Sequence, residues 1–379
     1  MRIVYVLTSL GVGGAERQAL AIADRMARRG HSVAILALRP VVVEEWPTGL
    51  RVVHLDIRKS PRSVIAGLMR AHRFLREFRP HLLHSHSFHA NIFARLLKLL
   101  FPSIKVVSTV HNVYEGGGQR MLAYRLTDSL ACRTIVVSQA AADRFLLLKA
   151  IRPDKCRVVP NGIDLAEFTP SEDRRNGMRV ELAAGSSFVW LAAGRMVPAK
   201  DLPNLLRAFT LVREAFPDAQ LWIAGAVPGA EMKKVRRADG IGWSLVGLSS
   251  SSRGFHEGVR RFGLRRDMPA LFDAADAFVL SSAWEGMPLA VGEAMAMEKP
   301  VVATDAGGTR ELVGHAGIVV PVADAGALAA AMLDLMNRPS KVGQALGQSA
   351  RARIASRFSI DSRADAWEAL YRAVVEASS

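Results

Sequence analysis

A repeated alternation of short β-branched runs with amphipathic stretches limits the fold more than any other feature of this sequence. In the N-terminal part, the runs predict strands at 3–7, 32–38, 82–84, 105–110, 134–137 and 157–159. Helical patterns lie between them at 15–29, 64–78, 90–100, 119–130 and 140–149. Strands that alternate with helices form parallel sheets with helices on both faces. The sequence therefore predicts an α/β fold of doubly wound parallel sheets.

The alternation stops once and restarts, which predicts two domains. The interruption is the turn sequence at 160–164, followed by a polar stretch at 169–176 that is rich in charge and turn formers. Beyond it, strands are predicted at 188–192, 220–224, 277–280, 300–303 and 317–319, and helices at 202–216, 268–274, 289–297, 323–336, 341–357 and 361–377. We expect an N-terminal Rossmann-like domain over 1–165, a C-terminal one over 166–358, and a last helix within 359–379. That helix is expected to pack back on the first domain through Trp367 and Tyr371.

Open parallel sheets bind ligands beyond the carboxyl ends of their strands. The two predicted domains are therefore expected to face a central cleft, with the ligand sites across it. Half of the residues are hydrophobic and 22% are charged, which is a globular composition. Cys132 and Cys156 show no metal or redox spacing, which favours a cytoplasmic protein. Arg2 and the apolar stretch 3–10 superficially resemble a signal peptide, but glycines and no cleavage site follow, so this stretch is interpreted as a first strand.

Positive charge is concentrated in the N-terminal half. Of the net charge of +15, residues 1–165 supply 25 Lys and Arg against 11 Asp and Glu, whereas residues 166–379 hold 25 against 24. Both halves contain 20 arginines, so a general arginine bias does not explain the difference. A basic half indicates an anionic partner, namely a membrane surface, a phosphorylated acceptor or nucleic acid. Nucleic acid is disfavoured, because no basic patch is interleaved with aromatic residues.

Two helical stretches bear on the membrane alternative. Arginines recur at three-residue intervals along the first, at Arg70, Arg73, Arg76 and Arg79. The second, 92–101, is mostly apolar and is interrupted by Arg95 and Lys98. Such helices suit a protein that rests on an anionic membrane and meets a lipid-linked acceptor there. An ordinary solvated helix face explains them equally well.

The segment with the clearest chemistry is Trp284-Glu285-Gly286-Met287-Pro288-Leu289, with Glu293 downstream. Pro288 suits the first position of a helix, where its missing N–H would be unpaired. The free N–H groups and the dipole of a helix start favour a phosphate, and Gly286 lets the backbone approach it. At 1.5 Å per residue, Glu293 lies about 7–8 Å beyond Pro288. Two carboxylates at this separation suit the hydroxyl groups of a hexose and a ribose that are joined by a diphosphate. Alternatively, Glu285 only complements the helix dipole and Glu293 is a solvated helix residue.

Two glutamates separated by seven residues within EGMPLAVGEAMA resemble the signature of glycosyltransferase family 4, retaining enzymes with the two-domain GT-B fold. Further matching pieces follow the order of the family: GGAE at 13–16, TVHN at 109–112, PNGID at 160–164, GR at 194–195, KD at 200–201, DAADAFVLSS at 273–282, TDAGGTREL at 304–312 and PVAD at 321–324. The resemblance implies a UDP- or GDP-sugar donor, a glycan or lipid-linked acceptor, and no metal or other cofactor.

The resemblance also implies roles for single residues. It assigns donor binding to Gly14, Gly194, Arg195, Lys200, Leu264, Glu285, Gly286, Met287, Pro288, Leu289 and Glu293. Arg195 and Lys200 are expected to clamp the diphosphate and to stabilise the leaving nucleotide in place of a metal. Without the family, surface salt bridges would explain these two cations as well. Glu285 is expected to contact the transferred sugar and Glu293 the ribose.

The acceptor is expected on the first domain. The resemblance assigns its binding to Gly13, Gly14, Glu16 and His111, and assigns catalysis to His111, Glu285, Arg195 and Lys200. The glycines at 11–14 superficially resemble a dinucleotide fingerprint, but Glu16 stands in place of its third glycine. Arg39 ends the second strand where an acidic residue would bind NAD, so an NADP enzyme is an alternative.

Four histidines, His81, His84, His86 and His89, invite a metal interpretation. They have no acidic or cysteine partner nearby, whereas metal sites need three or four convergent ligands, so no metal is expected. The chain also departs from the family pattern after 221–224, where Gly225-Ala226-Val227-Pro228 replaces the usual Gly-Asp-Gly-Pro. A Ser/Gly-rich stretch at 247–258 then predicts a mobile loop. This departure puts in doubt the nucleobase contacts near Leu264.

The prediction is a cytoplasmic retaining glycosyltransferase for cell-surface polysaccharide or glycolipid, with a peripheral position on the inner membrane face as an extension. The implied mechanism is front-face attack, in which the departing phosphate oxygen takes the proton of the acceptor. Two alternatives stay open. One is a GT-B phosphorylase, which releases a sugar phosphate. The other is a non-catalytic scaffold that binds nucleotide-sugars.

Overall fold

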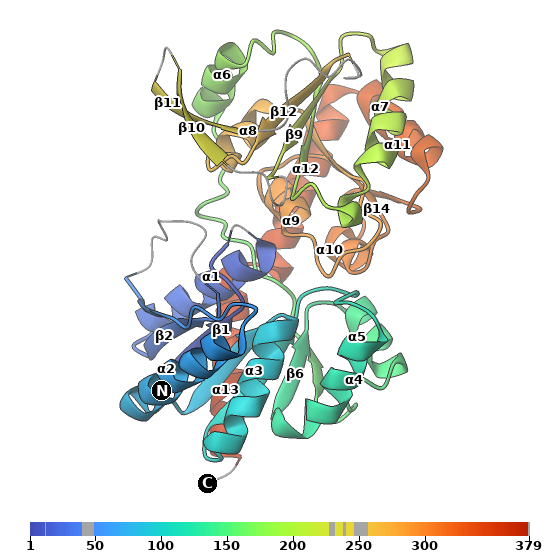
Figure 1. Ribbon diagram of the computed structural model, residues 1–379. Helices are drawn as coiled ribbons and strands as arrows, with labels where there is room; N and C mark the ends of the chain where they lie inside the picture. The colour runs from blue at the N-terminus through green and yellow to red at the C-terminus, as the bar shows by residue number, and fades with distance from the viewer. Residues whose placement is uncertain (12, 40–48, 227–231, 238–239, 246–256, 378–379) are drawn as a thin grey trace. The chain divides into compact units, whose positions relative to one another are not determined.

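Figure 1 shows the protein as a computed structural model, which describes residues 1–11, 13–39, 49–226, 232–237, 240–245 and 257–377. The chain divides into two compact units. The first unit comprises residues 1–162 and 358–379, and the second comprises residues 163–357. The chain passes from one to the other inside the turn sequence 160–164, and returns between the last two helices.

The first unit is built on a seven-stranded sheet in the order β3-β2-β1-β4-β5-β6-β7, with every neighbouring pair parallel. Its strands are β1 (Arg2–Leu7), β2 (Ser32–Ala37), β3 (Arg51–His54), β4 (Leu82–His86), β5 (Lys105–Val110), β6 (Arg133–Val136) and β7 (Cys156–Val158). The strand order reverses between β1 and β4, and open α/β sheets bind ligands at such a reversal. The predicted doubly wound fold is confirmed.

Helices cover both faces of this sheet. They are α1 (Gly14–Arg28), α2 (Pro61–Phe78), α3 (Phe88–Leu100), α4 (Gly118–Thr127), α5 (Gln139–Leu147) and α13 (Ile360–Glu376). Alternate residues of β1 point to opposite faces. Ile3, Tyr5 and Leu7 pack with α1 and α13, whereas Val4 and Val6 pack with α2 and α3.

The last helix, α13, is held by buried polar contacts as well as by apolar packing. Trp367 and Tyr371 are both buried, as predicted. The Tyr371 hydroxyl lies 3.0 Å from the Tyr5 hydroxyl and 2.6 Å from His84 Nδ1. On the same helix, Glu368 accepts a hydrogen bond from Arg29 at 3.0 Å. These contacts tie residues more than 280 positions apart into one core.

The second unit has a six-stranded parallel sheet in the order β12-β9-β8-β13-β14-β15. Its strands are β8 (Val189–Ala193), β9 (Gln220–Ala224), β12 (Val259–Gly263), β13 (Ala277–Leu280), β14 (Val301–Thr304) and β15 (Ile318–Val320). A separate antiparallel pair is formed by β10 (Met232–Arg237) and β11 (Gly240–Leu245). The helices are α6 (Glu172–Glu181), α7 (Leu202–Ala215), α8 (Met268–Ala274), α9 (Leu289–Ala296), α10 (Thr309–Val313), α11 (Ala325–Asn337) and α12 (Ser340–Arg357). Helices α7 and α11 pack together on one face of the sheet.

One sequence interpretation of the second unit is wrong. The polar stretch 169–176, predicted as part of the interruption between the two domains, contains the start of α6. Ser171 caps this helix by accepting a hydrogen bond from the N–H of Arg174. The arginines of α6 then pair with the carboxylates of Asp273 and Asp276. A helix held by charge pairs lacks the apolar periodicity on which the prediction relied. The predicted mobile loop at 247–258 lies almost entirely outside the described residues.

Candidate functional site

Lys200 and Glu285 join two strand ends of the second unit. Lys200 ends the 3-10 turn Pro198–Lys200 after β8, and Glu285 follows β13. Lys200 Nζ lies 2.5 Å from Glu285 Oε1, and the same oxygen accepts a hydrogen bond from Ser282 Oγ at 2.7 Å. The exposed fractions of the Lys200 and Glu285 side chains are 23% and 12%. This edge of the sheet therefore offers one cation and one carboxylate side by side.

Hydrogen bonds fix the backbone around this pair. Thr304 Oγ1, at the end of β14, donates to the carbonyl of Ser282 at 2.6 Å. The Gly308 N–H donates to the carbonyl of Gly286 at 2.9 Å. Ser281 Oγ donates to the carbonyl of Lys200 at 2.8 Å. The loops after β8, β13 and β14 are thus held as one surface.

Helix α9 starts within this surface. The structure places Pro288 at the N-cap, with φ −74° and ψ 104°, so the prediction that it is the first helical residue is wrong by one position. Its extended ψ keeps it outside the helix, which begins at Leu289. Gly286 and Met287 are buried in the preceding loop. Glu293, in the second turn, is 5% exposed, which excludes a freely solvated side chain.

Three glycines end the strands beside this pair. Gly194 has φ +147°, and a Cβ there would lie 2.7 Å from Lys200 Cε. Gly225 has φ +156°, and a Cβ there would lie 1.8 Å from the Gly194 carbonyl oxygen. The Gly225 N–H donates to the Gly263 carbonyl at 2.7 Å. Only glycine fits this close approach. Packing therefore requires Gly225, the first residue of the segment 225–228 that departs from the family pattern.

The remaining predicted donor residues of this unit lie on neighbouring loops. Arg195 follows Gly194 and is exposed, and no described residue forms an ion pair with it. Leu264 follows Gly263 and is half-buried. Arg265 beside it is engaged with Asp267, at 2.8 Å between Nε and Oδ1. Arg195 is thus available for an anion, whereas the Arg265 guanidinium is already paired.

In the first unit, the predicted acceptor residues Gly13, Gly14 and Glu16 form the start of α1. Gly13 is the buried N-cap and Gly14 the first helical residue. A Cβ at Gly13 would lie 2.3 Å from Glu16 Oε2, so the carboxylate folds back over the helix start. A carboxylate at that place repels a phosphate and accepts hydrogen bonds from hydroxyl groups. This end of α1 therefore suits a sugar hydroxyl.

His111 lies directly after β5 and pairs with His86, the last residue of β4. His86 Nδ1 and His111 Nε2 are 2.8 Å apart, and the two rings stack with centroids 5.1 Å apart. Burial lowers the pKa of His111 to about 4 and that of His86 well below its usual value. Both rings are therefore neutral near pH 7. Sequence reasoning had placed His86 only in a histidine cluster and missed this pairing, although adjacent parallel strands bring their ends together.

Glu115 is a second residue that sequence reasoning missed. Glu115 Oε1 accepts a hydrogen bond from the His111 N–H at 3.2 Å, and Oε2 accepts one from the Tyr124 hydroxyl at 2.6 Å. Asn91 Nδ2 donates to the same hydroxyl at 2.9 Å. Burial raises the pKa of Glu115 to about 7. This carboxyl group anchors the loop of His111 to α3 and α4.

The four histidines considered for a metal lie in different surroundings. His84 and His86 are buried, whereas His81 and His89 are exposed. The Arg2 N–H donates to His81 Nδ1 at 3.0 Å, and Thr109 lies 2.8 Å from His84 Nε2. Within the described ranges, no three His, Cys, Asp or Glu side chains converge in a way that could hold a metal ion.

Two family models match the chain, one over each unit. Residues 12–167 match Glycosyltransferase Family 4, and residues 187–338 match Glycosyl transferases group 1. Among individual proteins, the UDP-Gal:alpha-D-GlcNAc-diphosphoundecaprenol alpha-1,3-galactosyltransferase of Escherichia coli is 26% identical over 84% of this chain and 81% of its own. A D-inositol 3-phosphate glycosyltransferase of Saccharomonospora viridis is 28% identical over 94% of this chain and 88% of its own.

Solved structures share the fold of the whole chain. HepE of Anabaena, in complex with UDP-glucose, superposes with a TM-score of 0.81 at 20% identity and covers 98% of this chain and 99% of its own. Sucrose-phosphate synthase from Thermosynechococcus elongatus also has a TM-score of 0.81 at 20% identity, with full coverage of both chains. These similarities establish the GT-B fold.

Proposed function

The chain belongs to the GT-B glycosyltransferases of family 4 and group 1, and on that basis we propose that it moves a sugar from a UDP- or GDP-sugar to a glycan or lipid-linked acceptor with retention at the anomeric carbon. The observation that carries the proposal is the Lys200–Glu285 pair at the carboxyl ends of β8 and β13. A nucleotide-sugar presents a diphosphate next to sugar hydroxyls. A cation and a carboxylate side by side match those two groups.

Each residue of this surface has a proposed part in the transfer. Lys200 and Arg195 bind the diphosphate oxygens, and the first N–H groups of α9 add positive potential there. Glu285 accepts hydrogen bonds from the transferred sugar. Glu293, which is buried in the second turn of α9, accepts hydrogen bonds from the ribose hydroxyl groups. Leu264 lies on the loop that is proposed to meet the nucleobase.

The bond changes require no nucleophile from the protein. The bond between the anomeric carbon and the diphosphate oxygen breaks, and its electron pair stays on that oxygen. Lys200 and Arg195 stabilise the negative charge that develops there. The acceptor hydroxyl attacks the same face of the sugar, and its proton passes to the departing phosphate oxygen. We propose that these two cations make a metal ion unnecessary, and that His111, Gly13, Gly14 and Glu16 hold the acceptor side.

A panel of UDP-, GDP- and ADP-sugars tests this proposal. The purified chain is expected to release a nucleoside diphosphate from one of them, with or without EDTA, and to give a product with the anomeric configuration of the donor by NMR. Lys200→Met is the matched inactive control. Release of a sugar phosphate would indicate a phosphorylase instead. No turnover or hydrolysis of any donor in the panel would overturn the enzyme proposal.

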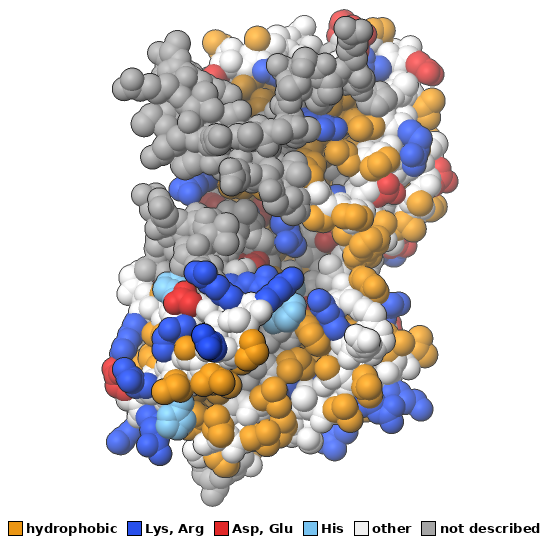
Figure 2. Space-filling view, viewed as in Figure 1, with side chains coloured by type: hydrophobic (Ala, Val, Ile, Leu, Met, Phe, Trp, Pro, Cys, Tyr) orange, Lys and Arg blue, Asp and Glu red, His pale blue; other side chains and the backbone are white. Residues whose placement is uncertain are grey.

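A face of the first unit bears on the location of the acceptor. Helices α2 and α3 lie on the same side of the sheet and carry exposed large apolar side chains, which Figure 2 shows next to basic ones. These are Val64, Ile65, Leu68, Met69, Leu96, Leu99 and Leu100. The exposed basic residues of α2 include Arg62, Arg70, Arg73 and Arg76. Arg79 is not part of this helix face, because it is the left-handed C-cap.

Arg95 does not belong to this face, which corrects the sequence interpretation of 92–101. Its side chain is fully buried and donates to Ser108 Oγ, Thr134 Oγ1 and the carbonyl of Tyr124. The exposed part of α3 is therefore more apolar than the sequence suggested. None of the helices in the described part of the chain is long and apolar enough to cross a bilayer.

We propose that this α2/α3 face rests on the anionic inner surface of a cytoplasmic membrane, where a lipid-linked acceptor is presented. Apolar side chains flanked by arginines are the composition that binds such a surface. The E. coli relative is named for an acceptor linked to diphosphoundecaprenol. Liposome flotation tests this. Wild type is expected to float with phosphatidylglycerol vesicles at low salt, and an Ile65→Gln/Met69→Gln variant to float less. The matched control, Val180→Gln/Leu211→Gln on the second unit, should float like wild type, and equal flotation of all three proteins would contradict the proposal.

A further inference from the structure

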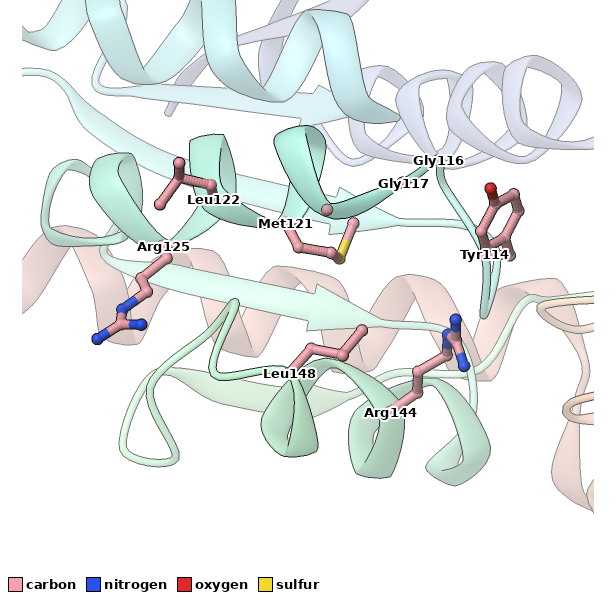
Figure 3. Close-up of a pocket in the computed structure, with 9 residues that line it drawn as sticks. Tyr114, Gly116, Gly117, Met121, Leu122, Arg125, Arg144 and Leu148 are labelled. Atoms are coloured by element: carbon pink, nitrogen blue, oxygen red, sulfur yellow. The ribbon is translucent and has the colours of Figure 1, made fainter.

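A groove between α4 and α5 lies beside the loop that carries His111. It has a volume of about 360 Å³ and is lined by Tyr114, Gly116, Gly117, Gly118, Met121, Leu122, Arg125, Arg144 and Leu148 (Figure 3). Tyr114 is three positions after His111, so their Cα atoms are at most about 11 Å apart. None of the groove residues has a part in the donor site proposed above. The groove is therefore a second candidate ligand site on the first unit, close in the chain to His111.

The chemistry of the groove changes along its length. At one end lie Tyr114, the glycines at 116–118 and Arg144, whose guanidinium carbon is 5.9 Å from the centre of the Tyr114 ring. Helix α4 starts there at Gly118, and its N-cap Gly117 provides no side chain to satisfy the free N–H groups. From that end the floor and walls continue along Met121, Leu122 and Leu148 (Figure 3). Arg125 lies beyond Leu122, at the far end (Figure 3). The end at Arg144 therefore suits an anion, and the apolar middle suits a hydrocarbon segment.

Charge at the groove is positive. Arg125 and Arg144 are both exposed, and no described carboxylate forms an ion pair with either. The nearest acidic side chain in the sequence, Asp143, accepts a hydrogen bond from Gln139 at 2.7 Å. Leu122 and Leu148 have exposed fractions of 53% and 43%, high values for leucines. Apolar surface next to unpaired guanidinium groups favours a ligand that is both apolar and anionic.

We propose that this groove binds the phosphate and the first hydrocarbon segment of a polyprenyl-phosphate-type acceptor, an inference that rests on the transferase function proposed above. The phosphate lies at Arg144 and the start of α4, and the hydrocarbon runs along Met121, Leu122 and Leu148. The sugar that such a lipid carries then lies on the His111 side of the phosphate. The groove thus selects acceptors by their lipid part, whereas the strand ends select the donor.

Calorimetric titration of the full chain with farnesyl diphosphate, kept below its micellar concentration, tests this groove. Wild type is expected to bind the probe more than tenfold more tightly than inorganic diphosphate or farnesol, because each of these presents only half of the ligand. Arg144→Gln and Leu148→Asn are each expected to weaken binding about tenfold. Arg357→Gln, an exposed arginine at the end of α12 in the second unit, is the matched control, with unchanged affinity. Thermal denaturation checks that every variant is folded.

Two measurements separate this groove from the donor site. UDP and GDP should not displace the probe, and Arg144→Gln should hydrolyse the donor sugar at the wild-type rate. Equal affinity of wild type and Arg144→Gln for farnesyl diphosphate, or full displacement of the probe by UDP or GDP, would overturn the proposal. If the probe binds as expected but no nucleotide-sugar is turned over, the transferase proposal fails and the groove stands. If a nucleotide-sugar is turned over but farnesyl diphosphate does not bind, the groove proposal fails and the transferase proposal stands.

Discussion

His86 Nδ1 lies 2.8 Å from His111 Nε2, and the other ring nitrogen of His86 is buried with no hydrogen-bond partner among the residues that the structure describes. A buried N–H without an acceptor is less tolerable than a buried acceptor without a donor. The proton of the neutral His86 ring is therefore on Nδ1, from which it is donated to His111. His111 then carries its own proton on Nδ1. This pair fixes which nitrogen of His111 is the donor, so His86 is a positioning residue.

Removing the His86 donor is expected to impair turnover more than substrate binding. His86→Leu should lower kcat about tenfold, which corresponds to about 1.4 kcal/mol, with little change in the KM for the donor. His86→Asn keeps an N–H near the Nδ1 position and should recover most of the rate. In a His111→Ala background, His86→Leu should cost nothing further. If it costs another tenfold there, His86 acts independently of His111.

Lys200 and Glu285 are expected to respond differently to nucleotide and nucleotide-sugar. Glu285→Gln frees Lys200 from its 2.5 Å ion pair, so affinity for the nucleoside diphosphate should stay equal or rise, while kcat falls about 100-fold or more. Lys200→Met should weaken the nucleoside diphosphate and the nucleotide-sugar alike, by about tenfold. Titration calorimetry with both ligands measures the contrast. Loss of nucleoside diphosphate binding in Glu285→Gln would show that the carboxylate supports the fold of this loop and not the sugar.

Most of the fold was predictable because buried parallel strands and their helices have distinct periodicities. The elements that the sequence pattern did not predict are those that do not bury a run of apolar residues. Strand β3 forms the edge of its sheet and its four residues are half-buried or exposed, so no pattern marks it. Helix α6 is fixed by Arg174, Arg175 and Arg179, whose partners Asp273 and Asp276 lie about 100 residues away. Such distant charge pairs leave no local signal.

The motifs in the sequence identified single residues of the candidate site but not the contacts between them. Motifs on separate strand ends named Lys200, Glu285 and His111, because each follows a strand. They did not show that Lys200 and Glu285 touch, or that Glu115 holds the His111 loop. The spacing of His84 and His86 invited a metal interpretation. In the structure, His84 instead contacts the Tyr371 hydroxyl on α13, 287 positions later in the chain. Long-range packing, and not spacing, decides what each of these histidines contacts.

Gly225 is expected to be among the least replaceable glycines of the second unit. Gly225→Ala places a Cβ 1.8 Å from the Gly194 carbonyl oxygen at φ +156°, so the two strand ends must move apart. We expect a loss of about 2 kcal/mol or more in the free energy of unfolding, and weaker nucleotide binding. Gly177→Ala, inside α6 where a Cβ meets nothing within 4 Å, is the control and should stabilise by about 0.5–1 kcal/mol. Urea unfolding measures both, and equal effects of the two substitutions would contradict the steric argument.

Acid is expected to destabilise the first unit, because its buried histidines resist protonation. Burial lowers the pKa of His84 and His86 well below the usual value and that of His111 to about 4. Below the unfolded pKa of about 6.5, the unfolded chain binds more protons than the folded one. The stability that these histidines contribute is therefore complete above about pH 6.5 and is lost as the pH falls. Each of these histidines lowers the free energy of unfolding by up to about 1.4 kcal/mol for each pH unit of acidification.

Glu115 opposes this trend over part of the same range. Burial raises its pKa to about 7, so between about pH 4.5 and 7 the folded state binds the extra proton, and its contribution is lost as the pH rises. Glu368, with a pKa lowered to about 2, stays ionised in the folded state above pH 5 and adds little slope there. Burial also lowers the pKa values of His31, His81 and His89, so the histidines outweigh the one carboxyl group and leave a net loss of stability on acidification. Urea unfolding at pH 7.5, 6.0 and 5.0 should show it, and Glu115→Gln should make the loss steeper because the opposing group is gone. A stability that is flat or rises from pH 7.5 to 5.0 in wild type would mean that the histidines are protonated in the folded state.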